Sequence, residues 1–204
     1  MTLRLILLLL TAEPAEPDWK TESAPAGVTL ESRPVKDSAF YEYRAQTDTD
    51  APVSALCDAI FDWGSIEKDH DQLKSRTLLE DLGERRIVYD QLDPPVVSCR
   101  DFAFTVARDR RPDGSCRLDF FPTNDKAPKA PDGWVRMEKL KGSWTFEPKP
   151  DGKTHVTYRL WADPAGAIPA VFVHGSQREA AVATLQKGIV KGKQYASKTQ
   201  GGGR

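Results

Sequence analysis

Apolar and polar side chains alternate at a period of two residues through most of the chain, which predicts a protein built mainly from half-buried β-strands. The pattern predicts two strands between residues 28 and 48, the second over Phe40–Thr47. Clusters of Gly, Pro and Asp, such as residues 111–114, mark the turns between the later strands. These later predicted strands are Leu73–Leu82, Arg85–Leu92, Phe102–Asp109, Cys116–Phe121, Val135–Phe146 and Thr154–Ala162.

Two stretches have the 3.6-residue period of an α-helix instead. Asp50-Ala51-Pro52 is a typical helix start, and the apolar residues from Val53 to Phe61 recur at helical spacing. After Asp163-Pro164 a second and longer helix is predicted to run toward Tyr195, with one face marked by Val171, Arg178, Val182, Leu185 and Ile189. The order of elements predicts an α+β fold in which one curved antiparallel sheet wraps around a helix.

The predicted strands have one apolar and one polar face. Phe102, Phe104 and Val106 share a face, whereas Asp101 and Thr105 lie on the other. We therefore expect each strand to be buried on one side and wet on the other. Beneath the last helix the apolar faces can form a solid core or line a pocket, and periodicity alone leaves both open.

The charge balance excludes one class of partner. The 29 basic and 30 acidic residues nearly cancel, with a formal net charge of -1, and neither sign forms a block, so we expect no nucleic-acid binding. Apolar runs fall short of the roughly 18 to 20 residues that cross a membrane as a helix. The body of the chain is therefore expected to be one globular domain outside the bilayer.

The two ends are not expected to belong to that domain. A positive charge followed by the apolar run Leu5–Leu10 is typical of a secretory signal, which we place over residues 1–15; the alternative is a mis-assigned start or a frayed leader. Residues 16–27 read as a linker, 28–196 as the domain and 197–204 as a flexible tail. We expect a periplasmic or secreted protein, or otherwise a cytoplasmic one.

The three cysteines do not indicate a metal site, because the spacings of Cys57, Cys99 and Cys116 match no zinc pattern. A hairpin about residues 111–114 would place Cys116 opposite Asp109 and far from Cys99, which disfavours a disulfide between them. We expect all three to be small buried apolar side chains. The scattered histidines suggest no metal, and Asp69-His70-Asp71 reads as a solvated turn.

Several short motifs occur in a consistent order. Asp-Pro-Ala-Gly-Ala-Ile-Pro at 163–169 follows the last predicted strand, and upstream lie Ile-Val-Tyr-Asp at 87–90, Pro-Pro at 94–95, Arg-Asp-Phe at 100–102 and Gly-Ser-Trp at 142–144. This arrangement resembles START domains, the steroidogenic acute regulatory protein-related lipid-transfer family. The resemblance extends over about residues 28 to 195.

The resemblance implies a helix-grip fold, in which the sheet grips the C-terminal helix and encloses a hydrophobic cavity. It implies a monomeric, non-enzymatic carrier without a cofactor, which holds one sterol, isoprenoid or phospholipid and touches membranes transiently. Segment 168–172 would move as the gate, with Gly166 and Pro169 setting its bend. The ligand-binding residues would be Val88, Asp90, Phe102, Phe104, Val106, Leu118, Phe120, Trp144, Tyr158, Ile168 and Phe172.

The resemblance also leaves questions about Asp90. Steroidogenic members pair an acid at this place with an arginine at the position of Val106, so that pair is broken here. If the Asp90 carboxylate points inward, it needs a hydrogen bond from an arginine or from a ligand hydroxyl, or it has to be protonated. The alternative is that Asp90 lies at a strand end and reaches water. The candidate donors are Arg76, Arg100 and Arg117.

Two other functions stay open at this point. Related helix-grip proteins include polyketide cyclases, for which Asp90 and Tyr158 would be the obvious polar pair in the cavity, and an empty scaffold for protein contacts is a third possibility. Lys187, Lys191 and Lys193 near the end of the last helix either complement its C-terminal dipole or dock the helix on anionic headgroups.

Overall fold

The computed structural model describes residues 18–62, 72–95, 97–166, 168 and 170–201. One sheet has the strand order β1-β2-β3-β10-β9-β7-β6-β5-β4, and β8 pairs with β6 off this path. Every pairing is antiparallel except β6 with β8. The elements are β1 (Lys20–Glu22), β2 (Thr29–Pro34), β3 (Tyr41–Thr49), α1 (Val53–Phe61), β4 (Leu73–Asp81), β5 (Arg85–Leu92), β6 (Arg100–Arg110), β7 (Cys116–Pro122), the 3₁₀ helix η2 (Asn124–Lys126), β8 (Val135–Arg136), β9 (Lys139–Pro148), β10 (Thr154–Asp163) and α2 (Ala170–Gly201).

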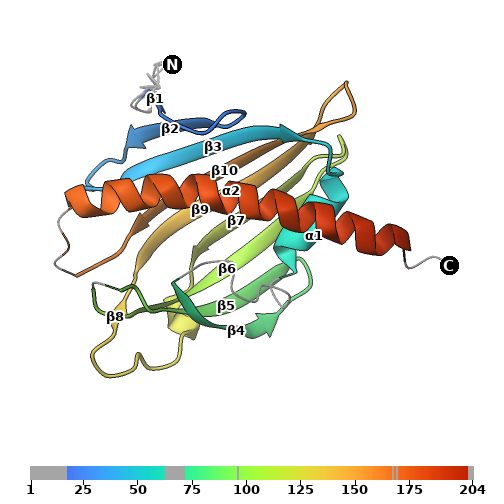
Figure 1. Ribbon diagram of the computed structural model, residues 1–204. Helices are drawn as coiled ribbons and strands as arrows, with labels where there is room; N and C mark the ends of the chain where they lie inside the picture. Colours follow the sequence, from blue (N-terminus) through green and yellow to red (C-terminus); the bar gives the residue numbers. More distant parts are fainter. Residues whose placement is uncertain (1–17, 63–71, 96, 167, 169, 202–204) are drawn as a thin grey trace, which may run out of the picture.

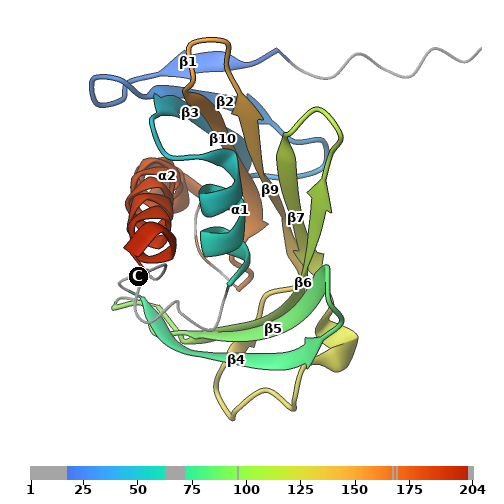
Figure 2. The same cartoon turned by 90° about the vertical axis from the view of Figure 1, so that its right-hand side faces the viewer.

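The sheet curves around α2, as the helix-grip expectation states. Figure 1 shows α2 lying across the sheet, and Figure 2 shows α1 and α2 together on its concave side. In β10 the alternation puts Val156 and Tyr158 on this inner side, where they are 0% and 6% exposed. The strand period thus predicts correctly which side chains face the helix. Among the described residues, no helix is long and apolar enough to span a membrane.

Two glycines of α2 approach the sheet and α1 closely. A Cβ at Gly188 would stand 2.6 Å from Cη2 of Trp144, and one at Gly192 would stand 2.4 Å from Cδ2 of Leu56 on α1. Leu185, three residues before Gly188, is fully buried. The absent side chains let the backbone of α2 approach β9 and α1 closely. This half of the helix is therefore held firmly, together with the core beneath it.

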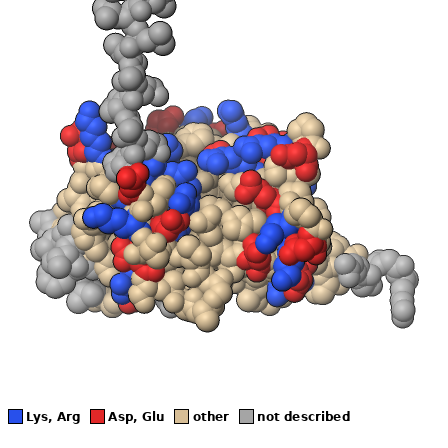
Figure 3. Space-filling view, turned by 90° about the horizontal axis from the view of Figure 1, so that it is seen from above, with Lys and Arg blue, Asp and Glu red and all other residues tan. Residues whose placement is uncertain are grey.

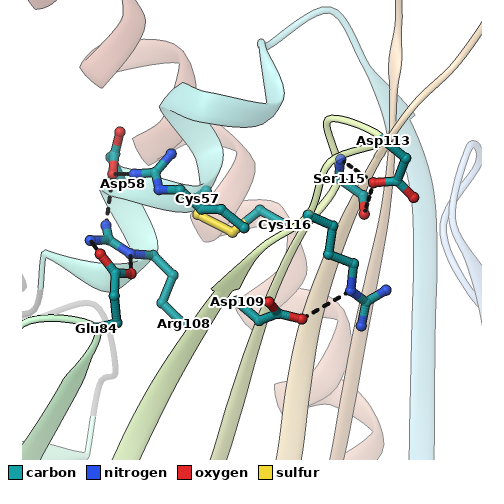
Figure 4. The surroundings of a disulfide bond; sticks show 10 residues. Cys57, Asp58, Glu84, Arg108, Asp109, Asp113, Ser115 and Cys116 are labelled. Atoms are coloured by element: carbon teal, nitrogen blue, oxygen red, sulfur yellow. Dashed lines mark hydrogen bonds and ion pairs between the residues drawn. A yellow bond between two sulfur atoms is a disulfide. The ribbon is translucent and has the colours of Figure 1, made fainter.

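A disulfide joins Cys57 of α1 to Cys116 of β7, with the Cα atoms 6.2 Å apart (Figure 4). We expected all three cysteines to be small buried apolar side chains. That expectation was wrong for Cys57 and Cys116, which are buried but bonded to each other, and for Cys99, which is only half-buried. The hairpin register also differs by one residue from the expected one, since Cys116 lies opposite Arg110. The sequence could not show this pairing because it depends on where α1 crosses the sheet. Cys99 is free, and its thiol donates to Asp93 Oδ1 at 3.2 Å.

Beside the disulfide, Arg108 ties three elements together (Figure 4). Its guanidinium donates to Asp58 of α1 at 2.9 Å and, through two nitrogens, to Glu84 in the turn between β4 and β5. The first helix is thereby attached to the sheet by a covalent bond and an ion-pair network.

On the face drawn in Figure 3, basic and acidic side chains are interspersed.

Strand β6 is buried on both faces, contrary to the expectation of one wet face. Asp101 and Thr105, on its outer face, are 0% and 6% exposed. The chain that follows β7 folds against them: Thr123 shares a 2.6 Å hydrogen bond with Thr105, and Arg136 of β8 binds Asp101. This covering segment comes from a loop whose path the strand period does not encode.

Some element boundaries also differ from the expected ones. Residues 20–22, within the expected linker, form the edge strand β1, and α2 continues to Gly201 through the first part of the expected tail. The expected strand Val135–Phe146 is divided into β8 and β9. Helix α1 begins at Val53, with Pro52 as its N-cap. The expected signal at 1–15 and the turn Asp69-His70-Asp71 lie outside the described residues.

Candidate functional site

A cavity of about 520 Å³ lies between the concave side of the sheet and α2. Its size falls within the roughly 300–1,000 Å³ of sites that enclose one small molecule. Most of its wall is apolar, contributed by β6, β7, β9 and β10 from below and by α2 from above. The large apolar side chains in this wall are Phe102, Phe104, Phe120, Leu140, Trp144, Tyr158 and Leu160.

The cavity occupies only one end of the concave side, because α1 fills the other. Val106 and Leu118 are fully buried members of the core cluster that includes α1 residues such as Leu56. Ile60 of α1 and Gly188 of α2 both line the cavity, so they mark where the packed core stops. The solid core and the pocket, which periodicity left as alternatives, therefore coexist.

Asp90 lines the cavity, and its carboxylate accepts hydrogen bonds from an arginine. Arg76 of the neighbouring strand β4 grips its carboxylate with two hydrogen bonds, Nε to Oδ1 at 2.6 Å and Nη2 to Oδ2 at 2.5 Å. The two side chains are 4% and 15% exposed. Of the three candidate donors, Arg76 is the one that pairs with Asp90, since Arg117 binds Asp119. A paired carboxylate and guanidinium of this kind is tolerated in a low-dielectric wall.

Arg100 holds the turn that leads into α2. Its Nε donates to Pro164 O at 3.2 Å and its Nη2 to Ala165 O at 3.4 Å, while Nη1 donates to Ser98 O. The residue is 4% exposed, and burial lowers the pKa of its guanidinium. The turn has the expected bend, since Gly166 takes a positive φ of 73°; Pro169 lies outside the described residues.

Two further polar side chains, Thr184 and Gln177, come from α2, the roof of the cavity. Thr184 of α2 hydrogen-bonds the hydroxyl of Tyr158, whose pKa burial nonetheless raises well above its usual value. Gln177, one turn after the start of the described side chains of α2, donates from Nε2 to Ala162 O at 2.8 Å. Sequence reasoning did not single out Thr184 or Gln177, because a polar residue on a half-exposed helix normally faces water.

The structure distributes the residues predicted from the resemblance between wall and core. Val88, Val106 and Leu118 pack in the core and do not line the cavity. The side chain of Phe172 lies outside the described part. Those that do line the cavity are Asp90, Phe102, Phe104, Phe120, Trp144, Tyr158 and Ile168. The sequence analysis did not predict several other sheet residues that line the cavity, and it named Arg76 and Arg100 only as candidate partners for Asp90. These lining residues are Leu73, Arg76, Leu92, Arg100, Leu140, Leu160 and Ala162.

The lysines of α2 do not occupy its C-terminal end. The helix continues to Gly201 with Lys198 in its last turn, so the helix dipole, which acts over the last turn, does not account for Lys187. Lys187 instead is an exposed residue at the cavity. Among the described residues, no group of three or more His, Cys, Asp or Glu side chains is placed to hold a metal ion.

Comparisons with known proteins agree with this architecture. No family model matches the chain. The uncharacterized protein PA1579 of Pseudomonas aeruginosa is 30% identical over 174 residues, which cover 83% of this chain and 84% of that protein. This degree of identity over most of both chains shows a common family.

Solved structures show the same fold at lower identity. The STAR-related lipid transfer protein from Xanthomonas axonopodis superposes with a TM-score of 0.76 at 22% identity, covering 86% of this chain and 98% of that one. Human StAR-related lipid transfer protein 5 gives 0.74 at 19% identity, covering 87% and 88%. The chain therefore belongs to the family of the Pseudomonas protein PA1579 and has the helix-grip fold of START domains.

Proposed function

We propose that the protein is a carrier that encloses one apolar ligand, such as a sterol, an isoprenoid or a phospholipid, in the cavity under α2. The observation that carries this proposal is the apolar wall around about 520 Å³ of internal space. The names of the Xanthomonas and human neighbours, both lipid transfer proteins, support it. Burial of apolar surface stabilises such a complex by roughly 25 cal/mol per Å², so a few hundred Å² contribute several kcal/mol before ordering costs.

Loading requires the roof to move, and the packing of α2 is unequal along its length. Gly188 and Gly192 hold its second half against Trp144 and Leu56. Its first half, from Val173 to Ala180, covers the cavity and is fastened at the turn by Arg100. We therefore place the gate at segment 168–172, which includes the beginning of α2, with the second half of the helix as the fixed end.

The rival function is an enzyme that uses the cavity to fold a reactive chain, with Asp90 and Tyr158 as its acid and base. General acid–base catalysis needs groups that exchange protons near the working pH. The Asp90 carboxylate is gripped by Arg76, and burial raises the pKa of Tyr158. Both features favour the carrier over proton-transfer chemistry.

The disulfide supports a location outside the cytoplasm. Disulfides persist in oxidising compartments and are rare where thiols are kept reduced. The bond between Cys57 and Cys116 is therefore in accord with a periplasmic or secreted protein. The proposed carrier acts as a monomer and touches membranes transiently. Exposed Pro95 and Val97 at the cavity lining offer an apolar contact for such a surface.

Native mass spectrometry of the purified protein tests the carrier function, followed by extraction and identification of any bound lipid. We expect one ligand per chain and a mass that returns to that of the polypeptide after extraction. Protein purified from membrane-containing lysate that carries no lipid and binds none from vesicles would contradict the proposal.

A further inference from the structure

One acceptor at the cavity has no partner. The side-chain oxygen of Gln177, Oε1, is buried and accepts no hydrogen bond from any residue that the structure describes. Gln177 itself lines the cavity from α2. Buried polar atoms are almost always hydrogen-bonded, because leaving one unpaired forfeits its interaction with water. This atom therefore indicates a partner that the described residues do not supply.

The orientation of the Gln177 amide is determined by its other end. Nε2 donates to the carbonyl oxygen of Ala162 at 2.8 Å. A flipped amide would place Oε1 against that carbonyl, two acceptors in contact, which is unfavourable. The orphan atom is therefore an oxygen, and the missing partner has to be a hydrogen-bond donor.

Donors for the same ligand group lie nearby. Arg100 holds Pro164 O, two residues after the Ala162 carbonyl that binds Gln177, so both side chains lie at the end of the cavity beside the β10–α2 turn, which we call the turn end. A guanidinium has five N–H groups, and in Arg100 three of them donate to backbone carbonyls. Two N–H groups of Arg100 have no partner among the described residues. The turn end thus offers one acceptor and two donors.

The other polar groups of the wall are already engaged. Asp90 is gripped by Arg76, and the Tyr158 hydroxyl is bound by Thr184. A hydroxyl group both donates and accepts, so it satisfies Gln177 and accepts from Arg100. A carboxylate only accepts, and it would bring negative charge against Oε1.

We infer that the turn end binds the hydroxyl group of an amphiphilic alcohol, with Gln177 Oε1 accepting a hydrogen bond from the hydroxyl and Arg100 donating a hydrogen bond to its oxygen. The inference rests on the proposed carrier function and narrows it to apolar molecules with a terminal hydroxyl, oriented with the hydroxyl toward the β10–α2 turn. The hydrocarbon part then lies along the aromatic wall toward Phe120 and Trp144.

Three matched probes test this orientation: 1-tetradecanol, its methyl ether and tetradecanoate. Their affinities are measured by displacement of the neutral fluorescent dye N-phenyl-1-naphthylamine from delipidated protein. The ether keeps the oxygen but cannot donate, so we expect the alcohol to bind about tenfold more tightly than the ether. Tetradecanoate is expected to bind more weakly than the alcohol at neutral pH.

The variant Gln177→Leu removes the acceptor and keeps an apolar side chain of similar size. We expect the alcohol-to-ether ratio to fall to about one, while the ether binds as well as before. Ser176→Ala is the matched control on the same turn of α2: Ser176 also lines the cavity, but its hydroxyl already donates to Val173 O. Thr184→Val tests the competing position at Tyr158, and both variants are expected to keep the tenfold ratio.

Several results would overturn the inference. A wild-type ratio near one, a ratio that survives Gln177→Leu, or its loss in Thr184→Val would place the hydroxyl elsewhere or nowhere. Tighter binding of tetradecanoate would assign the turn end to anions through Arg100. If Gln177→Leu does not fold, the ratio of alcohol to ether affinity in the wild type still tests whether the cavity binds a donating hydroxyl. Equal binding of alcohol and ether refutes only this inference, whereas binding of neither, in a protein that carries no lipid, refutes the carrier function as well.

Discussion

Gly188 of α2 lies directly on the ring of Trp144: a Cβ at Gly188 would stand 2.6 Å from Cη2 of Trp144 and 3.1 Å from Cδ1 of Ile60. This contact separates the firmly packed half of α2 from the half that covers the cavity. A residue with any side chain here has to displace either the helix or the indole. The length of the cavity and the position of its roof thus depend on one absent methyl group.

We expect Gly188→Ala to destabilise the protein by about 2 kcal/mol, because overpacking shifts the helix or the ring. Gly175→Ala is the matched control, since in the described part of the chain no atom beyond the neighbouring residues and the helix's own backbone lies within 4 Å of a Cβ there. This variant is expected to be up to about 1 kcal/mol more stable, from the helix propensity of alanine. Urea denaturation measures both, and equal effects of the two substitutions would contradict the close packing.

Removing the charge of Asp90 should lower the free energy of unfolding. Asp90→Asn leaves the buried guanidinium of Arg76 without its carboxylate, and we expect a loss of about 3 kcal/mol. Asp119→Asn, which disrupts the more exposed pair with Arg117, is expected to cost less than about 1 kcal/mol. The free energy of unfolding is measured for each variant.

The same variant separates the carrier from the enzyme. A carrier with Asp90→Asn should retain bound ligand or change its preference, whereas a cyclase would lose turnover by orders of magnitude. Lipid retention by native mass spectrometry is the direct readout. Loss of a demonstrated catalytic activity with unchanged ligand binding would favour the enzyme.

The buried carboxyl of Asp101 predicts a dependence on acid. Burial pushes its pKa upward, but hydrogen bonds from Arg136 and Tyr89 outweigh burial and hold the pKa below the ordinary value. A lowered folded-state pKa contributes stability that is present above the unfolded pKa, near 4, and is lost as the pH falls through the folded value. Stability should therefore decline below about pH 4.

The variant Asp101→Asn isolates this contribution, because other carboxyls with lowered pKa values, such as Asp113 and Glu84, remain in both proteins. Urea midpoints measured between neutral and acid pH should fall less steeply for Asp101→Asn than for the wild type. Parallel curves for the two proteins would show that Asp101 does not contribute to the slope.

Loss of the disulfide should loosen α1. Replacing Cys57 and Cys116 by serine is expected to cost about 2–4 kcal/mol, because the bond closes a long loop in the unfolded chain. Cys99→Ser is the control and should have little effect, since Cys99 forms no disulfide. Thermal unfolding with and without reductant makes the comparison, and a wild type insensitive to reductant would argue against the bond.

A covalent bond across the proposed gate should stop exchange. A cysteine pair that joins segment 168–172 to the sheet, in a Cys99→Ser background, is expected to abolish ligand transfer between vesicles when oxidised and to restore it when reduced. Transfer of a fluorescent lipid is followed in time. Transfer kinetics that are the same in both states would refute the gate.

Local sequence was sufficient for much of the fold. The period of two places Val156 and Tyr158 on the inner face of β10, and the predicted strand Arg85–Leu92 has the bounds that the structure gives it. The motif at 163–169 marks the turn into α2 correctly. These features depend on side-chain alternation and turn residues, which act between near neighbours in the chain.

Only the tertiary structure decided which part of the concave side is filled by side chains and which part is a cavity. Whether Val106 or Phe104 lines a cavity depends on how far α1 reaches under α2, and the partners Cys57 and Cys116 meet only because α1 crosses β7. The sequence by itself determined which faces are apolar. Only the packing of elements distant in the chain decided how much of that apolar face is filled by the protein, because contact between such elements leaves no local pattern.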